Sequence, residues 1–172
     1  MTTPNLLIDQ QHLSWAGGVV YAGLALGSVI AAGALGSLAT FPNLSGWYAG
    51  LKKPSFSPPN WIFGPVWTLL YLIMAWAFYR ILRLPPSMPG RSLAIVAFVV
   101  QLTLNASWSW AFFANHSPQR GLVVIVLLWL AIVVTMMSFW PLDVPAGVSF
   151  IPYLAWVSFA TILNGATYRL NR

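Results

Sequence analysis

The sequence contains no cysteine and very few charged side chains. The absence of cysteine excludes disulfide bonds, thiolate metal sites and cysteine nucleophiles. Asp9 and Asp143 are the only acidic residues and both lie outside the apolar segments, so a paired-carboxylate acid/base mechanism within those segments is not available. Charged residues make up 6% of the chain and hydrophobic residues 59%, which is too little charge to cover a water-soluble surface. The composition therefore predicts an integral membrane protein.

The eight lysines and arginines give a formal charge of +6, but they do not form a nucleic-acid-binding cluster. They stand singly or in pairs at the ends of apolar segments, as topological charges do. The larger group on one side of the membrane comprises Lys52, Lys53, Arg120, Arg169 and Arg172. In an inner membrane the positive-inside rule places the first loop and the C-terminus in the cytoplasm, whereas in an outer membrane the rule applies poorly. We expect the lipid bilayer as a partner and no nucleic acid.

Five segments are long and apolar enough to cross a bilayer as helices, which takes about 20 residues. They are residues 13–38, 62–82, 91–113, 121–140 and 148–168. The connection 40–61 contains several prolines, which cannot continue a helix, so it predicts a structured loop. Pro152 predicts a bend in the last span. The expected fold is an all-α integral membrane bundle of five transmembrane helices, forming one domain over residues 1–172.

Small residues recur along one face of the first span. Gly23, Gly27 and Ala31 follow at four-residue spacing, and an adjoining stripe contains Ala32 and Gly36. Such stripes let another helix approach closely. The partner is either another helix of this chain or the first span of a second copy, and we expect a homodimer in addition to intramolecular packing.

Aromatic and amide side chains share helix faces in the second, third and fifth spans. If these spans converge beneath the first loop, they line a pocket for a flat, apolar ligand with a polar edge. The alternative is that the tryptophans fill the core or anchor the membrane interface. The candidate pocket residues are Trp67, Tyr71, Asn105, Trp108, Trp156 and Ala160.

No residue spacing predicts a metal site, a phosphate-binding glycine loop or a nucleophile triad. We therefore expect no metal and no required cofactor. His116 lies at the end of a span and is predicted to form interfacial hydrogen bonds, with an axial-ligand or proton-carrying role as the alternative.

Three sequence blocks carry a family resemblance. They are WYAGLKKPSFSPPNWIFGPVW at 47–67, QLTLNASWSWAFF at 101–113 and PYLAWVSFATILN at 152–164. In these blocks, and in their order and placement within five spans, the chain resembles bacterial members of the TspO/MBR family of tryptophan-rich sensory proteins and translocator proteins. The resemblance implies a five-helix bundle, often dimeric, whose pocket opens toward the first loop and binds porphyrins such as protoporphyrin IX.

The resemblance also implies residue roles. Trp67 and Trp156 match the pocket tryptophans that bacterial relatives use in light-dependent porphyrin breakdown, and Asn105, Trp108 and Ala160 match other pocket positions. Charge, rather than the family pattern, suggests that Lys52 and Lys53 reach the propionates of a porphyrin. The expected function is a tetrapyrrole-binding membrane receptor or sensor. An enzyme that photo-oxidatively degrades porphyrin, with the two pocket tryptophans as candidate catalytic residues, and a porphyrin or sterol transporter are the alternatives.

Overall fold

The computed structural model describes residues 15–172, and every regular element in that part of the chain is helical. Each of the five long helices, with its flanking turns, is long and apolar enough to cross a membrane. The long helices are α2 (Trp15–Leu44), α4 (Phe63–Leu82), α5 (Arg91–Ser109), α6 (Pro118–Phe139) and α8 (Ile151–Leu170). The short elements are α3 (Trp47–Gly50), the 3-10 turn η1 (Asn60–Ile62), the π-helical turn η2 (Trp110–Ala114) and α7 (Val144–Val148). The all-α, five-span membrane fold is therefore confirmed; Asp9 lies outside the described residues.

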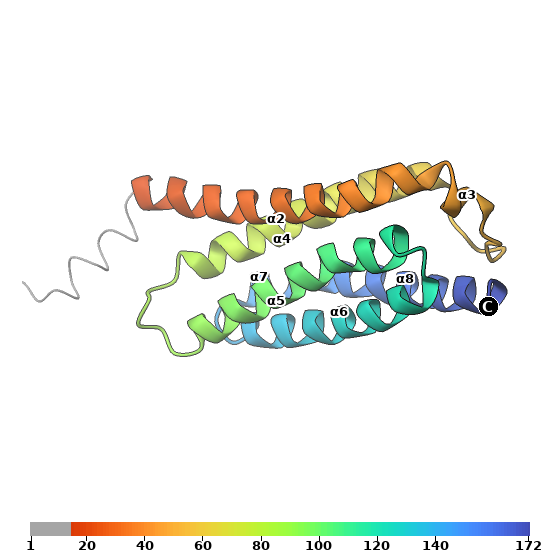
Figure 1. Ribbon diagram of the computed structural model, residues 1–172. Coiled ribbons are helices and arrows are strands. Elements are labelled where there is room, and N and C mark those ends of the chain that lie inside the picture. The colour runs from red at the N-terminus through yellow and green to blue at the C-terminus, as the bar shows by residue number, and fades with distance from the viewer. Residues whose placement is uncertain (1–14) are drawn as a thin grey trace, which may run out of the picture.

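The long helices run side by side along a common direction (Figure 1). The closely packed pairs are α5–α6, α6–α8, α2–α4 and α2–α5. At one end of the bundle, α4 also packs against α7, and stacked phenylalanines fill the core there. The rings of Phe78 and Phe98 lie 3.9 Å apart, and Phe139 and Phe150 pack around Phe98. This end of the bundle is closed by tight aromatic packing.

The first span continues past residue 38, its predicted end, to Leu44. Pro42 lies in the last turns of α2, where it removes one hydrogen bond without ending the helix. Two side chains donate back to helix carbonyls in this region: Thr40 Oγ1 to Gly36 and Asn43 Nδ2 to Ala39. The predicted loop is therefore shorter at its start, since the helix continues beyond the proline with these two side-chain hydrogen bonds around it.

The last predicted span does not bend at Pro152, because a new helix begins there. The short α7 precedes α8, and Pro152 lies in the first turn of α8, where a missing N–H costs little. Asp143 starts α7 because its Oδ1 accepts a hydrogen bond from the Ala146 N–H at 2.8 Å. The predicted bend at Pro152 is therefore wrong, since the helix begins there.

The two small-residue stripes of the first span have different environments. Ala32 and Gly36 are buried against the rest of the bundle. Gly23, Gly27 and Ala31 are exposed, and no atom lies within 4 Å of a Cβ built on either glycine. One stripe therefore serves intramolecular packing, and the homodimer remains a prediction for the other.

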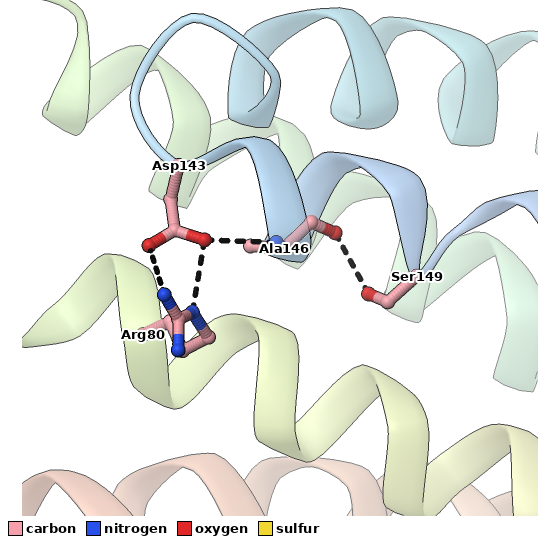
Figure 2. Close-up of polar contacts among 4 residues, drawn as sticks. All are labelled: Arg80, Asp143, Ala146 and Ser149. Atoms are coloured by element: carbon pink, nitrogen blue, oxygen red, sulfur yellow. Dashed lines mark hydrogen bonds and ion pairs between the residues drawn. The ribbon is translucent and has the colours of Figure 1, made fainter.

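An ion pair joins α4 to the start of α7 (Figure 2). Arg80 Nε and Nη2 donate to the two carboxylate oxygens of Asp143 at 2.9 and 2.8 Å. These hydrogen bonds lower the pKa of Asp143 below its ordinary value. Asp143 thus has two roles, since it pairs with Arg80 and caps α7.

The two roles of Asp143 predict different losses for two substitutions. Asp143→Asn keeps a good capping side chain and removes the charge, so we expect a loss of up to about 1 kcal/mol. Asp143→Ala removes the cap as well and should cost roughly 0.5–2 kcal/mol more. Because the folded pKa is lowered, the ion pair stabilises the protein above the unfolded pKa of about 4, and this contribution disappears as the pH falls through the folded pKa.

Thermal unfolding in detergent between pH 7 and pH 2 measures both effects. As the pH is lowered through the folded pKa of Asp143, the melting temperature of Asp143→Asn should fall less than that of the wild type. Equal melting temperatures for the two variants would show that the cap contributes nothing.

Candidate functional site

A chain of hydrogen bonds links α4, α5 and α8 inside the bundle. The Tyr71 hydroxyl donates to Asn105 Oδ1 at 2.7 Å, and Asn105 Nδ2 donates to the Tyr153 hydroxyl at 2.8 Å. Asn105 is 4% exposed and Tyr153 is 0% exposed. Because hydrocarbon offers no hydrogen bonds, these groups must pair with one another. The second, third and fifth spans therefore converge at this network.

Two predicted site tryptophans flank the network from opposite helices. The Trp67 ring on α4 lies 5.7 Å from Tyr71 and 6.3 Å from Tyr153, centroid to centroid. The Trp156 ring on α8 lies 5.7 Å from Phe63, which precedes Trp67 by one turn on α4. Each tryptophan thus contacts an aromatic ring of the opposite helix, and both are half-buried.

Two buried polar atoms close to this hydrogen-bond network have no hydrogen-bond partner within residues 15–172: Trp156 Nε1 and Gln101 Oε1. Gln101 lies one turn before Asn105, and its amide nitrogen makes only a 3.8 Å contact with the Met74 sulfur. An unpaired buried donor costs about 1–3 kcal/mol. The Trp156 indole N–H therefore offers a hydrogen bond to a carbonyl or carboxylate group of a ligand.

Trp108 belongs to a second hydrogen-bonded layer. Its Nε1 donates to Asn164 Oδ1 at 3.1 Å, and Asn164 Nδ2 donates to the Pro118 carbonyl at 2.7 Å. Its ring stacks on Phe112 at 5.4 Å. Ala160 lies one turn before Asn164 on the same helix. The Trp108 N–H therefore fastens α5 to α8, the Asn164 amide fastens α8 to the start of α6, and only the Trp108 ring is left for contact with a ligand.

The first loop, residues 45–59, crosses the end of the bundle at which α8 ends (Figure 1). Its Tyr48 ring lies 5.4 Å from Phe113 in η2, which follows α5, and its Phe56 ring lies 6.4 Å from Phe159 on α8. The loop therefore spans from α5 to α8 above the tryptophans.

Asn171, just past α8, fastens this loop. Its Oδ1 accepts from the Lys52 N–H at 3.0 Å, and its Nδ2 donates to the Lys52 carbonyl at 2.9 Å. Nδ2 also donates to the Thr167 carbonyl at 2.8 Å. One side chain thus connects the C-terminus of α8 to both backbone groups of a loop residue.

The side chains of Lys52 and Lys53 are exposed. Lys53 Nζ lies 4.3 Å above the Tyr48 ring, a cation–π contact. In the described part of the chain, neither ammonium group makes such a contact with Trp67 or Trp156. The structure therefore places both lysines on the loop rather than among the site aromatics, and their role at the ligand stays a prediction.

His116 lies at the same end of the molecule. Its Nε2 hydrogen-bonds Asn43 Oδ1 at 2.7 Å, and its ring stacks on Trp47 at 4.9 Å. Between residues 15 and 172, no group of three or more His, Cys, Asp or Glu side chains is placed to hold a metal ion. His116 thus makes the interfacial hydrogen bond that its position predicts.

Three residues of the site are absent from the sequence-based prediction. Tyr153 completes the network, Asn164 holds Trp108, and Phe63 contacts Trp156. Each lies three or four residues from a predicted site residue on the same helix. Extending the helical period by one turn would have found them.

Comparison with known proteins gives several matches. The sequence model of the TspO/MBR family matches residues 25–169. The chain is 43% identical over 148 residues to the tryptophan-rich protein TspO of Chlorobaculum tepidum, covering 86% of this chain and 94% of that protein. It is 42% identical over 125 residues to the tryptophan-rich sensory protein of Cereibacter sphaeroides (73% and 77%). It is 34% identical over 126 residues to the translocator protein of Homo sapiens (73% and 75%).

The Trp108 layer leaves no room for a side chain at Gly121. A Cβ there would lie 2.7 Å from Phe112 Cδ2 and 2.9 Å from Asn164 Oδ1. We expect Gly121→Ala to displace the Asn164 side chain and to destabilise the protein by about 1–3 kcal/mol. Gly165→Ala is the matched control, because its Cβ would meet only Leu122 Cδ1 at 3.8 Å. Thermal unfolding should separate the two variants, and equal melting temperatures would contradict the packing argument.

The two hydrogen bonds between the Asn171 side chain and the Lys52 backbone should limit the access of a protease to the first loop. Trypsin can cut after Lys52, whereas Pro54 protects the bond after Lys53. Removing two exposed hydrogen bonds of about 1 kcal/mol or less each should raise loop opening by up to about 30-fold. We expect faster cleavage of Asn171→Ala than of Asn60→Ala, whose side chain makes no hydrogen bond among the described residues. Equal cleavage rates would show that Asn171 does not hold the loop.

Proposed function

The chain belongs to the TspO/MBR family, and from that premise we propose that it binds a tetrapyrrole such as protoporphyrin IX between α4 and α8, beneath the first loop. It is a multi-pass integral membrane protein related to sensory and translocator proteins. Under this proposal it acts as a receptor that needs no further cofactor. The bound porphyrin is its ligand.

The observation that carries the proposal is the facing arrangement of Trp67 and Trp156 across a buried polar network. The α4 and α8 backbones are not a closely packed pair, and aromatic side chains fill the space between them. A flat macrocycle can replace ring–ring contacts with stacking contacts on its own faces. Side-chain rotation, without movement of the helix backbones, would then admit the ligand.

Polar groups around these rings match the polar edge of a porphyrin. The buried indole N–H of Trp156 has no partner within residues 15–172, and a ligand carboxylate or carbonyl would supply one. Lys52 and Lys53 place two cations on the loop above the site, where propionates at the water-facing edge would meet them. The apolar face of the ligand would then lie toward the membrane interior.

Tryptophan fluorescence tests this proposal directly. Protoporphyrin IX titrated in the dark should quench the wild-type protein saturably. Trp67→Phe with Trp156→Phe should weaken binding roughly ten-fold, because the smaller phenyl rings keep only part of two stacking contacts of roughly 0.5–1.5 kcal/mol each and the Trp156 N–H hydrogen bond of about 1 kcal/mol is lost.

The matched control replaces two tryptophans outside the site, Trp61→Phe with Trp140→Phe. Trp61 is 74% exposed and Trp140 is 42% exposed. The control should keep the wild-type affinity while losing some fluorescence. Absence of saturable quenching would contradict the proposal. An equal loss of porphyrin affinity in the two double variants would show that the binding site lies elsewhere.

A further inference from the structure

A second candidate binding site lies on the outer surface of the bundle, between α4 and the α7–α8 segment. It is an open groove of about 640 Å³, within the size range of ligand-binding clefts. Its walls exclude the residues of the tetrapyrrole site proposed above. The lining residues are Leu72, Ile73, Trp76, Val148, Ser149, Ile151 and Pro152.

The groove follows one face of α4. Leu72, Trp76 and Arg80 succeed one another at four-residue spacing, so they lie along one stripe of the helix. From Leu72 to Arg80 the helix rises about 12 Å, which is close to the roughly 15 Å thickness of one leaflet of the hydrocarbon core. The lining residues Leu72 and Trp76 therefore lie within the depth of one leaflet, and Arg80 lies one turn beyond Trp76, toward the end of the span.

The walls of the groove are apolar. The hydroxyl of Ser149 and the indole N–H of Trp76 are the polar side-chain groups of the lining residues, and the hydroxyl donates to the Ala146 carbonyl at 2.7 Å (Figure 2). The break between α7 and α8 falls at this residue. A hydrocarbon chain can therefore lie against the Ser149 hydroxyl without leaving that group unpaired.

Arg80 provides a cation at the outer end of the groove. Its guanidinium lies 5.0 Å above the ring of Trp76, which is itself a wall residue. Nε and Nη2 bind Asp143, and no hydrogen bond within residues 15–172 uses Nη1. Arg83 and Arg91 lie at the same end of the bundle. In the described part of the chain this end therefore carries three arginines and one aspartate, an excess of positive charge. This end of the groove therefore attracts an anion.

We propose that the groove binds an anionic glycerophospholipid. One acyl chain lies along Leu72 and Trp76, and the lipid phosphate accepts a hydrogen bond from Arg80 Nη1. The Arg80–Asp143 ion pair holds the guanidinium in position while its remaining nitrogen faces the headgroup layer. Both parts of the ligand, the apolar chain and the anionic head, are thus matched by adjoining parts of one surface.

Contact quenching by lipids brominated on the acyl chain tests this proposal. The full chain is reconstituted in phosphatidylcholine with increasing brominated phosphatidylglycerol or, separately, brominated phosphatidylcholine. The Trp76 signal is the difference between wild type and Trp76→Phe. We expect half-maximal quenching of this signal at about five-fold lower mole fraction of the anionic lipid, as one cationic contact of about 1 kcal/mol predicts.

Charge variants identify the cation. Arg80→Gln should make the two quenching curves coincide, while the matched Arg83→Gln should keep the preference. Asp143→Asn, which keeps Arg80 and the α7 cap, should keep or increase it, and it supports the assignment even if Arg80→Gln fails to fold. Val148→Phe, which fills the groove, should reduce quenching by both lipids.

Several results would overturn the proposal. Equal quenching by the two lipids in the wild type would mean an unspecific lipid contact. Loss of the preference in Arg83→Gln would assign the anion to another group. Stronger protection of Trp76 by a sterol than by unbrominated phosphatidylglycerol at equal mole fraction would assign the groove to a different ligand.

Discussion

Hydrocarbon cannot form hydrogen bonds, so polar side chains inside the bundle need partners within the protein, and among residues 15–172 only Trp156 Nε1 and Gln101 Oε1 are buried without one. Asn105 and Asn164 meet this requirement by using both ends of their amides: Asn105 connects Tyr71 to Tyr153, and Asn164 connects Trp108 to the Pro118 carbonyl. These bonds fix how α4, α5, α6 and α8 are rotated relative to one another. The position of the aromatic rings in the candidate site depends on that rotation.

The two ends of the bundle differ in how tightly they pack. At one end α4 meets α7 through the Arg80–Asp143 ion pair, above stacked phenylalanine rings. At the other end α4 and α8 meet mainly through aromatic side chains beneath a loop that Asn171 holds. Close packing resists change, whereas side chains between separated helices can rotate. The proposed tetrapyrrole site therefore lies at the more adaptable end.

Local irregularities of the helices also shape the molecule. The π-helical turn at the end of α5 places Phe112 against Trp108 and Phe113 against Tyr48, so α5 joins the site to the loop. The break between α7 and α8 recesses the surface beside Trp76 and forms one wall of the outer groove. Each irregularity thus opens or supports a surface that a regular helix would not provide.

The sequence by itself determined the membrane environment, the five spans and the helix faces that carry Trp67, Tyr71, Asn105 and Trp156. These are local properties, since the thickness of a bilayer sets span length and the helical period sets which residues share a face. Only the tertiary structure decided the pairings: Tyr153 with Asn105, Asn164 with Trp108, Asp143 with Arg80 and Asn171 with Lys52. Such pairs join residues far apart in the chain, and they depend on how each helix is rotated and shifted against its neighbours. No periodicity within one segment encodes that rotation.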